Sequence, residues 1–144
     1  MKRLIGLVLV VATMFVCVSA IAEDAIGHLN NAMAATQIRS QIDGPLVALV
    51  EKAKRDGGLS ELDVELLYLY YSAHMAIMDI SHVELEASTS STLSESTRTV
   101  ISSGEMLVDI VKEMKEKYSS GQGTWADTMG VAVNVIDANL SAGQ

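Results

Sequence analysis

The stretch SELDVELLYLYYSAHMAIMDISHVELEA, residues 60–87, decides the fold of this chain. It opens with Ser60 and Asp63 three positions apart, a capping-box pattern in which the hydroxyl caps a free backbone N–H and the carboxylate bonds back to the cap. The segment that follows is apolar around most of its circumference, and its consistently polar stripe is narrow: Glu61, Glu65, Ser72, Asp79 and Glu86. A helix of this kind is surrounded on most sides. We therefore expect residues 61–87 to form the central helix of a bundle.

Two further helices are predicted after the central one. A Ser or Thr followed by an acid three residues later also occurs at Thr92–Glu95 and at Thr124–Asp127, so we expect helices over about 93–118 and 125–140. In the last of these, apolar residues recur every three or four positions, the spacing of a seam against a neighbouring helix. At about 1.5 Å per residue, the central helix and the one after it are each about 40 Å long and are expected to form a hairpin.

Before the central helix, the sequence predicts a break. We expect one helix from Glu23 to about Gln41, which Asp43-Gly44-Pro45 ends. Proline is favoured at the first position of a helix, so a short second helix is expected from Pro45 to about Asp56. The chain has one proline and little alternation of period two, which argues against strands. The expected fold is all-α, an antiparallel up-down helical bundle of four to five helices with a long central helix hairpin.

The first 22 residues have the three-part layout of a secretory signal peptide. Lys2-Arg3 is a short positive segment, Leu4–Val18 is an apolar run, and Ala20-Ile21-Ala22 supplies small residues before Glu23. Because signal peptidase accepts small side chains one and three positions before the cut, we expect cleavage after Ala22. The chain then divides into a signal peptide over 1–22 and a single helical-bundle domain over 23–144. The competing interpretation is an uncleaved anchor, since the apolar run approaches the length that spans a bilayer.

Cleavage after Ala22 leaves a strongly acidic chain without cysteine. Cys17, the only cysteine, lies inside the predicted signal and lacks the small preceding residue typical of a lipidated cysteine. Disulfides and thiolate metal sites are then excluded from the mature protein. The 144-residue chain has a formal charge of −8, and loss of the two positive charges of Lys2 and Arg3 takes it to −10. That charge disfavours nucleic acid and anionic lipid headgroups and suits a basic protein partner.

The sharpest candidate site lies on the central helix. His74, Met78 and His82 are spaced four residues apart, on the face opposite to the acidic stripe, so they are expected to point inward one above the other. Imidazole suits copper(II) and zinc, a thioether suits copper(I), and the two histidines could also be axial ligands of haem. His82 lies about 12 Å along the axis from His74, so a second helix would have to supply further ligands. The competing interpretation is core packing, with hydrogen-bonded histidines and methionine as filler.

Two other features suggest binding. The stretch 88–103 is rich in Ser and Thr, whose hydroxyls could line a small-ligand pocket, although small residues also let two helices approach closely. Trp125, the only tryptophan, stands at a predicted loop-to-helix corner. A tryptophan there either plugs the end of the bundle or, when exposed, anchors a partner protein.

No motif for catalysis is present. The sequence has no nucleophile elbow, no paired metal-binding histidine motif and no phosphate-binding glycine loop. We therefore expect a non-enzymatic binding protein of the periplasm or the exterior that acts through protein–protein contact, as an inhibitor, an immunity protein or an accessory subunit does. The alternatives are a bundle that binds copper, zinc or haem, and a sensor or carrier of a small ligand. A membrane partner is expected only if the N-terminal segment is retained, and a homodimer would bury surplus apolar surface.

Overall fold

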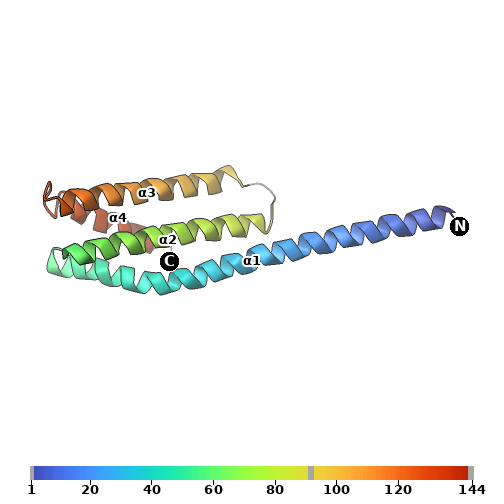
Figure 1. The fold of residues 1–144 in the computed structure, drawn as a ribbon, viewed down its shortest axis with the longest axis horizontal. Helices are drawn as coiled ribbons and strands as arrows, with labels where there is room; N and C mark the ends of the chain where they lie inside the picture. Colours follow the sequence, from blue (N-terminus) through green and yellow to red (C-terminus); the bar gives the residue numbers. More distant parts are fainter. Residues whose placement is uncertain (1, 91–92, 143–144) are drawn as a thin grey trace.

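The computed structural model describes residues 2–90 and 93–142, with side-chain surroundings from Asp24 onward. Four helices follow one another: α1 (Lys2–Asp56), α2 (Glu61–Ala87), α3 (Glu95–Ser119) and α4 (Met129–Ala142). The four helices pack together (Figure 1). α2 packs against α1 and α3, and α4 also packs against α1 and α3. The described ranges contain no strand. The prediction of an all-α bundle is confirmed, and a fifth helix is not seen in this part of the chain.

The central helix has the predicted bounds. α2 begins at Glu61 and ends at Ala87. Its capping box is formed: the backbone N–H of Asp63 donates to the Ser60 hydroxyl at 3.2 Å, and the backbone N–H of Ser60 donates to the Asp63 carboxylate at 3.3 Å. Three of its apolar side chains are fully buried, Val64, Leu67 and Tyr71. The nearly all-round apolar character of the segment thus indicated its place between other helices.

The predicted break at Asp43-Gly44-Pro45 is wrong. α1 continues through Pro45 as one helix, so the two helices expected over 23–41 and 45–56 are one. Proline removes a single backbone hydrogen bond and crowds the preceding turn, which bends a helix more often than it ends one when packing holds both sides. Here the first turns after the proline are held by Leu46 and Val50, both buried. Figure 1 shows α1 changing direction within the half that packs against the other helices.

The last two helices start later than predicted. Thr92, the expected cap of α3, lies outside the described residues, and Ser94 caps the helix instead by accepting from the backbone N–H of Thr97. The contacts expected between Thr124 and Asp127 form, with the Asp127 N–H donating to the Thr124 hydroxyl at 3.2 Å. They close a turn over residues 125–128, and α4 begins only after it.

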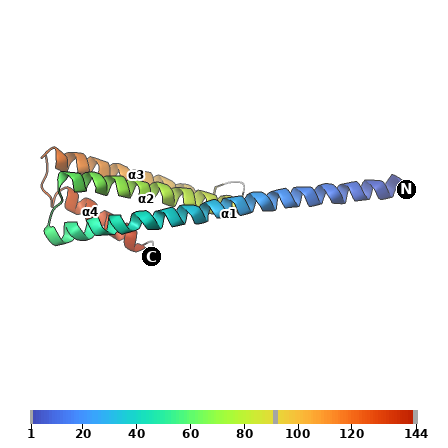
Figure 2. The ribbon, with the colours of Figure 1, turned by 60° about the horizontal axis from the view of Figure 1, so that its bottom comes forward.

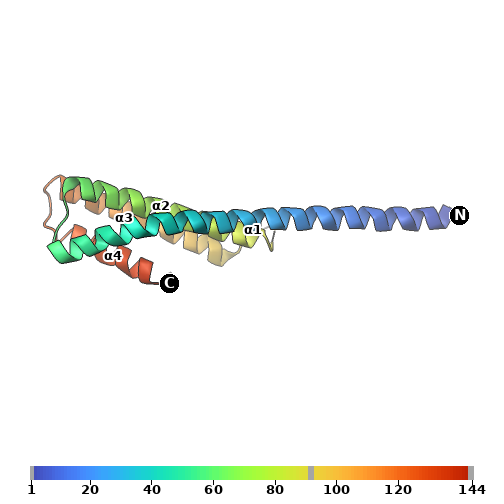
Figure 3. The same ribbon diagram turned by 90° about the horizontal axis from the view of Figure 1, so that it is seen from below.

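The core lies where all four helices meet. Each helix contributes fully buried side chains to it: Leu46 and Val50 from α1, Val64, Leu67 and Tyr71 from α2, Val111 from α3, and Met129, Ala132, Val133 and Ile136 from α4. α4 has 14 residues against the 27 of α2. Figures 2 and 3 show that α4 stops part-way along the long helices and runs obliquely to α1. We call the part of the bundle that contains α4 the inner half, and the part beyond it the outer half.

The N-terminal part of α1 extends past the other helices (Figure 3). The predicted signal peptide falls in this part, outside the residues whose side-chain surroundings are described, so it stays a prediction. From Asp24 onward, no helix combines the length and the apolar character that crossing a membrane requires.

Candidate functional site

His74 points from α2 toward α1, inside the bundle. Its Nδ1 lies 2.6 Å from a carboxylate oxygen of Asp43, and only 4% of the residue is exposed. The other carboxylate oxygen of Asp43 lies 3.7 Å from Nε of Arg39, one turn earlier on α1. A buried imidazole with a carboxylate on one nitrogen has its orientation and tautomer fixed. This pair therefore ties α1 to α2 just before Pro45.

A cavity of about 90 Å³ adjoins this pair. Its walls come from three helices: Arg39, Asp43 and Val47 of α1, His74 and Met78 of α2, and Asn139 and Leu140 of α4. The predicted neighbours His74 and Met78 thus share one cavity. His82 is not part of its lining, and no hydrogen-bond partner of its buried Nδ1 is found among the described residues. Across the same residues, no group of three or more His, Cys, Asp or Glu side chains is placed to hold a metal ion.

Asp79 lies on the opposite side of α2, against α3. A Cβ on Gly104 of α3 would stand 2.8 Å from Cε of Met75 and 3.4 Å from a carboxylate oxygen of Asp79, so a glycine allows this close approach of the two helices. Burial raises the pKa of the Asp79 carboxyl, and the charge of Glu105 raises it further, against the opposing effect of His82. One Asp79 oxygen is buried and has no hydrogen-bond partner in the described chain. This is a cost in stability at the α2–α3 contact.

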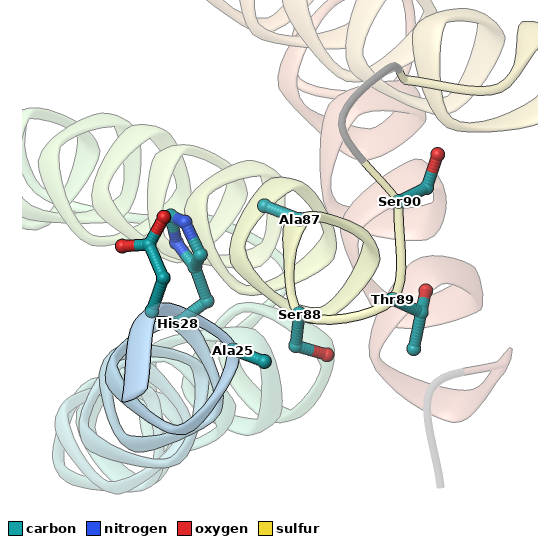
Figure 4. Close-up of a pocket in the computed structure, with 7 residues that line it drawn as sticks. Ala25, His28, Ala87, Ser88, Thr89 and Ser90 are labelled. Carbon is teal, nitrogen blue, oxygen red and sulfur yellow. The ribbon is translucent and has the colours of Figure 1, made fainter. Parts of the chain in front are cut away.

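A wider cavity of about 450 Å³ lies at the outer end of the bundle (Figure 4). Asp24, Ala25 and His28 of α1 line it, together with residues 87–90 at the end of α2. His28 Nδ1 lies 2.7 Å from a carboxylate oxygen of Glu84, which also accepts from the amide of Asn31 at 3.2 Å. The hydrogen bond from His28 is the main reason why the pKa of Glu84 is lowered. These contacts hold the outer parts of α1 and α2 together.

The hydroxyls predicted to line a pocket are used in two ways. Ser88, Thr89 and Ser90 line the outer cavity (Figure 4). The Ser88 hydroxyl donates to the carbonyl of Leu85, and the Thr89 hydroxyl donates to that of Glu86. Further along the stretch, Ser94 caps α3. The Ser/Thr-rich stretch therefore mainly provides hydrogen bonds at helix ends. Its first residues, 88–90, also line a cavity.

An apolar groove runs between α1 and α2 in the outer half. Its volume is about 320 Å³, and we call it the outer groove; it is lined by Leu29, Ala32, Met33, Thr36, Gln37, Ser81 and Leu85. Ala32 is buried at its floor, whereas Leu29, Met33 and Leu85 are 44%, 57% and 52% exposed. The sequence did not predict this groove. The only signal was that Leu29 and Met33 fall on the apolar face of their helix, which predicts burial and not exposure.

Trp125 closes the inner end of the bundle. Its ring meets that of Tyr118 edge to face, with 5.7 Å between centroids and 77° between planes. The Tyr118 hydroxyl donates to the carbonyl of Leu59, which joins the end of α3 to the α1–α2 connection. Trp125 itself is half-buried against the core. Of the two roles predicted for Trp125, a plug at the end of the bundle or an exposed anchor for a partner, this position corresponds to the plug.

The candidate sites are therefore a small cavity at His74, a wider cavity at the outer end, and an apolar groove between them on the surface. None of them brings together a nucleophile, a base and a group that orients the base. Comparison with known protein families, characterised proteins and solved structures finds no match to this chain.

Proposed function

We propose that this chain is an exported, non-enzymatic binding protein that acts through protein–protein contact, as an inhibitor, an immunity protein or an accessory subunit does. The observation that carries the proposal is the apolar surface of the outer half. Ile26, Leu29 and Met33 follow one another at helical spacing along α1, and all three are exposed. Leu85 of α2 stands across the groove from them. Contiguous apolar surface of this kind marks interaction sites in proteins that otherwise keep such side chains inside.

The proposed arrangement of the bundle is the antiparallel up-down order. The connection between α1 and α2 spans only residues 57–60, which supports neighbouring helices of opposite direction. The order of colours along the helices in Figure 1 supports the same order. With this order, both long helices of the groove present their sides to a partner. A side-on surface suits a helix or an extended segment of another protein.

Site-specific photocrosslinking in the producing cells tests the proposed function. A photoreactive amino acid placed at Met33 lies in the exposed groove wall, and one placed at Leu62, which is 68% exposed, lies in the first turn of α2 at the other end. We expect adducts with a discrete second protein from position 33 and none from position 62. Adducts from neither position, or the same set of adducts from both, would refute a specific protein contact at the outer half.

A second candidate function is metal binding at His74 and Met78, because these two side chains line one small cavity. Asp43 on Nδ1 of His74 is the kind of second partner that orients a metal-binding imidazole. An imidazole and a thioether suit copper(I) in particular, and a cavity of about 90 Å³ is large enough for an ion but not for a haem group.

Metal analysis of protein purified without a histidine tag tests this candidate. Copper bound by the wild type should be lost from the His74→Ala variant and kept by His82→Ala, since His82 does not line the cavity. Absence of stoichiometric copper or zinc from the wild type after loading, or equal loss in both variants, would remove the candidate.

The small-ligand alternative is confined to the outer cavity of about 450 Å³. His28 and the hydroxyls of residues 88–90 give that cavity its polar lining (Figure 4). A thermal-shift screen of small polar compounds would show it as stabilisation that His28→Ala abolishes. This proposal ranks third because the Ser88 and Thr89 hydroxyls already donate to the backbone.

A further inference from the structure

The outer groove begins beside the end of α4. The end of α4 places Asn139 and Leu140 against Val47 of α1 and Met78 of α2, around the small cavity. Beyond Met78, the next residues of α2 on this side are Ser81 and Leu85, and both line the outer groove. Along α1, Thr36, Met33 and Leu29 follow in the same outward direction at spacings of three and four. The groove therefore continues the α1–α2 surface that the end of α4 contacts, and α4 ends at Ala142 without lining it.

The way in which α4 fills the inner part indicates what the outer part accepts. α4 buries Met129, Ala132, Val133 and Ile136, which are spaced as i, i+3, i+4 and i+7 along one face of the helix. In the outer groove Ala32 is 5% exposed and forms a shallow floor. Thr36 and Ser81 bring their hydroxyl oxygens within 3.4 Å of each other across the same floor. Small residues between two larger walls let a third helix approach closely.

The outer half carries an excess of negative charge. Residues 24–38 of α1, 75–87 of α2 and 95–105 of α3 contain six carboxylates and one basic residue, Arg98, which acts on Glu86. From Asp24 onward, all lysines stand on the inner parts of α1 and α3, at positions 52, 54, 112, 115 and 117. A second copy of this chain would bring two acidic outer halves together, which costs free energy through like-charge repulsion. A partner with positive charge is favoured.

We propose that the outer groove binds one amphipathic helix of a partner protein, with apolar residues at i, i+3, i+4 and i+7 and with Lys or Arg at its flanks. The helix would lie beyond the end of α4 and rest between Leu29 and Met33 on one side and Leu85 on the other. Residues 24–38 of α1 extend about 21 Å along the helix axis, which corresponds to about four turns of a bound helix. This inference rests on the proposed protein-binding function and specifies the site and the chemistry of the partner.

Two designed peptides test the inference on the protein as it is exported. Both have 16 residues and leucines at i, i+3, i+4 and i+7 repeats; one has lysine and the other glutamate at the polar positions. We expect fluorescence anisotropy at low salt to show at least tenfold tighter binding of the lysine peptide. The Leu29→Asn variant should weaken that binding at least tenfold, and the matched Leu62→Asn variant, on the exposed side of the first turn of α2, should leave it unchanged. Circular dichroism of both variants checks that the bundle remains folded.

The outcomes separate this inference from the proposed function. Equal binding of the two peptides, or equal effects of the two variants, would overturn the basic-helix inference. A dimer that light scattering detects in the wild type and that Leu29→Asn dissociates would overturn it too, because a second copy would then fill the groove. If position 33 crosslinks to another protein while the peptides fail either comparison, the protein-binding function stands and only the helical, basic character of the partner is refuted.

Discussion

Tyr71 shows at the scale of one residue how a polar group is accommodated in the core. The side chain is fully buried, and burial raises the pKa of its phenol. Its hydroxyl accepts a hydrogen bond of 3.0 Å from the side-chain amide of Asn139, which fastens α4 to α2. A polar contact inside an apolar core is costly to leave half-formed, because the remaining partner stays desolvated.

The Tyr71→Phe variant should therefore lose stability although it loses only one oxygen atom. We expect the free energy of unfolding to fall by about 1–2 kcal/mol, since the amide of Asn139 is left without its acceptor. Urea unfolding followed by circular dichroism measures the change. Tyr70→Phe is the matched control: Tyr70 is half-buried, and no hydrogen bond of its hydroxyl is found among the described residues. A loss as large in the control as at position 71 would contradict the explanation.

Asp79→Asn should stabilise the protein at neutral pH. The pKa of Asp79 is raised because burial and the charge of Glu105 disfavour the carboxylate in the folded state. A carboxyl whose pKa is higher in the folded state destabilises it above the folded-state pKa, and this penalty disappears below the ordinary pKa of 3.8. We expect the melting temperature of the variant to exceed that of the wild type by about 1–3 °C at pH 7. The difference should shrink as the pH is lowered toward 4, and a gain that persists at pH 3.5 would contradict the electrostatic cause.

The candidate metal residues show how far helical spacing alone could predict a site. An eight-residue separation returns a side chain to the same face only approximately, because two steps of four residues advance it by about 80°. His74 and Met78 accordingly share a cavity, while His82 does not line it. The pairing of His74 with Asp43 could not be predicted, because it depends on the register of α1 against α2. That register is set by the packing of whole helices and not by any local pattern.

At the scale of the element, substitutions at two glycines can test the continuity of α1 and the way in which it ends. Gly44 is exposed within the continuous α1, and a Cβ there would meet nothing within 4 Å. Gly57 follows the last turn of α1 with φ +66°, a left-handed conformation, and its N–H donates to the carbonyl of Ala53. A Cβ on Gly57 also meets open space. The two positions therefore differ in backbone conformation and not in available room.

Alanine should have opposite effects at these positions. Gly44→Ala should raise the free energy of unfolding by about 0.5–1 kcal/mol, because alanine restricts the unfolded chain and favours helix. Gly57→Ala should lower it by about 1–2 kcal/mol, because an L-residue is strained in the left-handed region. Thermal unfolding of the two variants side by side measures both changes. If α1 instead ended at Asp43, alanine at position 44 would bring no gain.

Elements were predictable where a local signal and the tertiary packing agree. The capping box at Ser60 and the apolar run after it gave the bounds of α2. At Pro45 the two disagree: the local signal favours a new helix, and the buried residues on both sides keep α1 continuous. The outer groove has no local signal, since it exists because α4 is shorter than the helices beside it. Relative lengths and packing partners are properties of the assembled bundle.

At the scale of the whole molecule, the two halves differ in composition and in packing. The inner half holds the four-helix core and its lysines, including the ion pairs of Lys54 with Asp137 and of Lys115 with Glu65. The outer half holds the acidic outer parts of α1, α2 and α3, which α4 leaves partly uncovered. The inner half therefore supplies most of the buried core, and the proposed binding surface lies on the outer half. Substitutions in the outer half should therefore change the proposed binding without loss of the fold.

The predicted cleavage of the signal peptide concerns the whole molecule, because it decides whether residues 1–22 stay attached to the bundle. Cleavage after Ala22 removes Cys17, so the exported protein should begin at Glu23 and should not react with maleimide. The Ala22→Leu variant puts a bulky side chain where signal peptidase needs a small one. It should retain residues 1–22 and one reactive thiol. Ile21→Leu, at the tolerant middle position, should be processed like the wild type.

Intact-mass measurement and N-terminal sequencing of the three exported proteins distinguish cleavage from anchoring. A wild-type protein that begins at Met1 and carries one thiol would refute cleavage and favour the anchor. In that case the groove walls at Leu29 and Met33 would lie on the same helix as the apolar run Leu4–Val18, only about 16 Å of helix beyond its end. Partners at the membrane surface would then take precedence over free ones. If Glu23 is the first residue, the groove instead opens at the first turns of a freely diffusing protein.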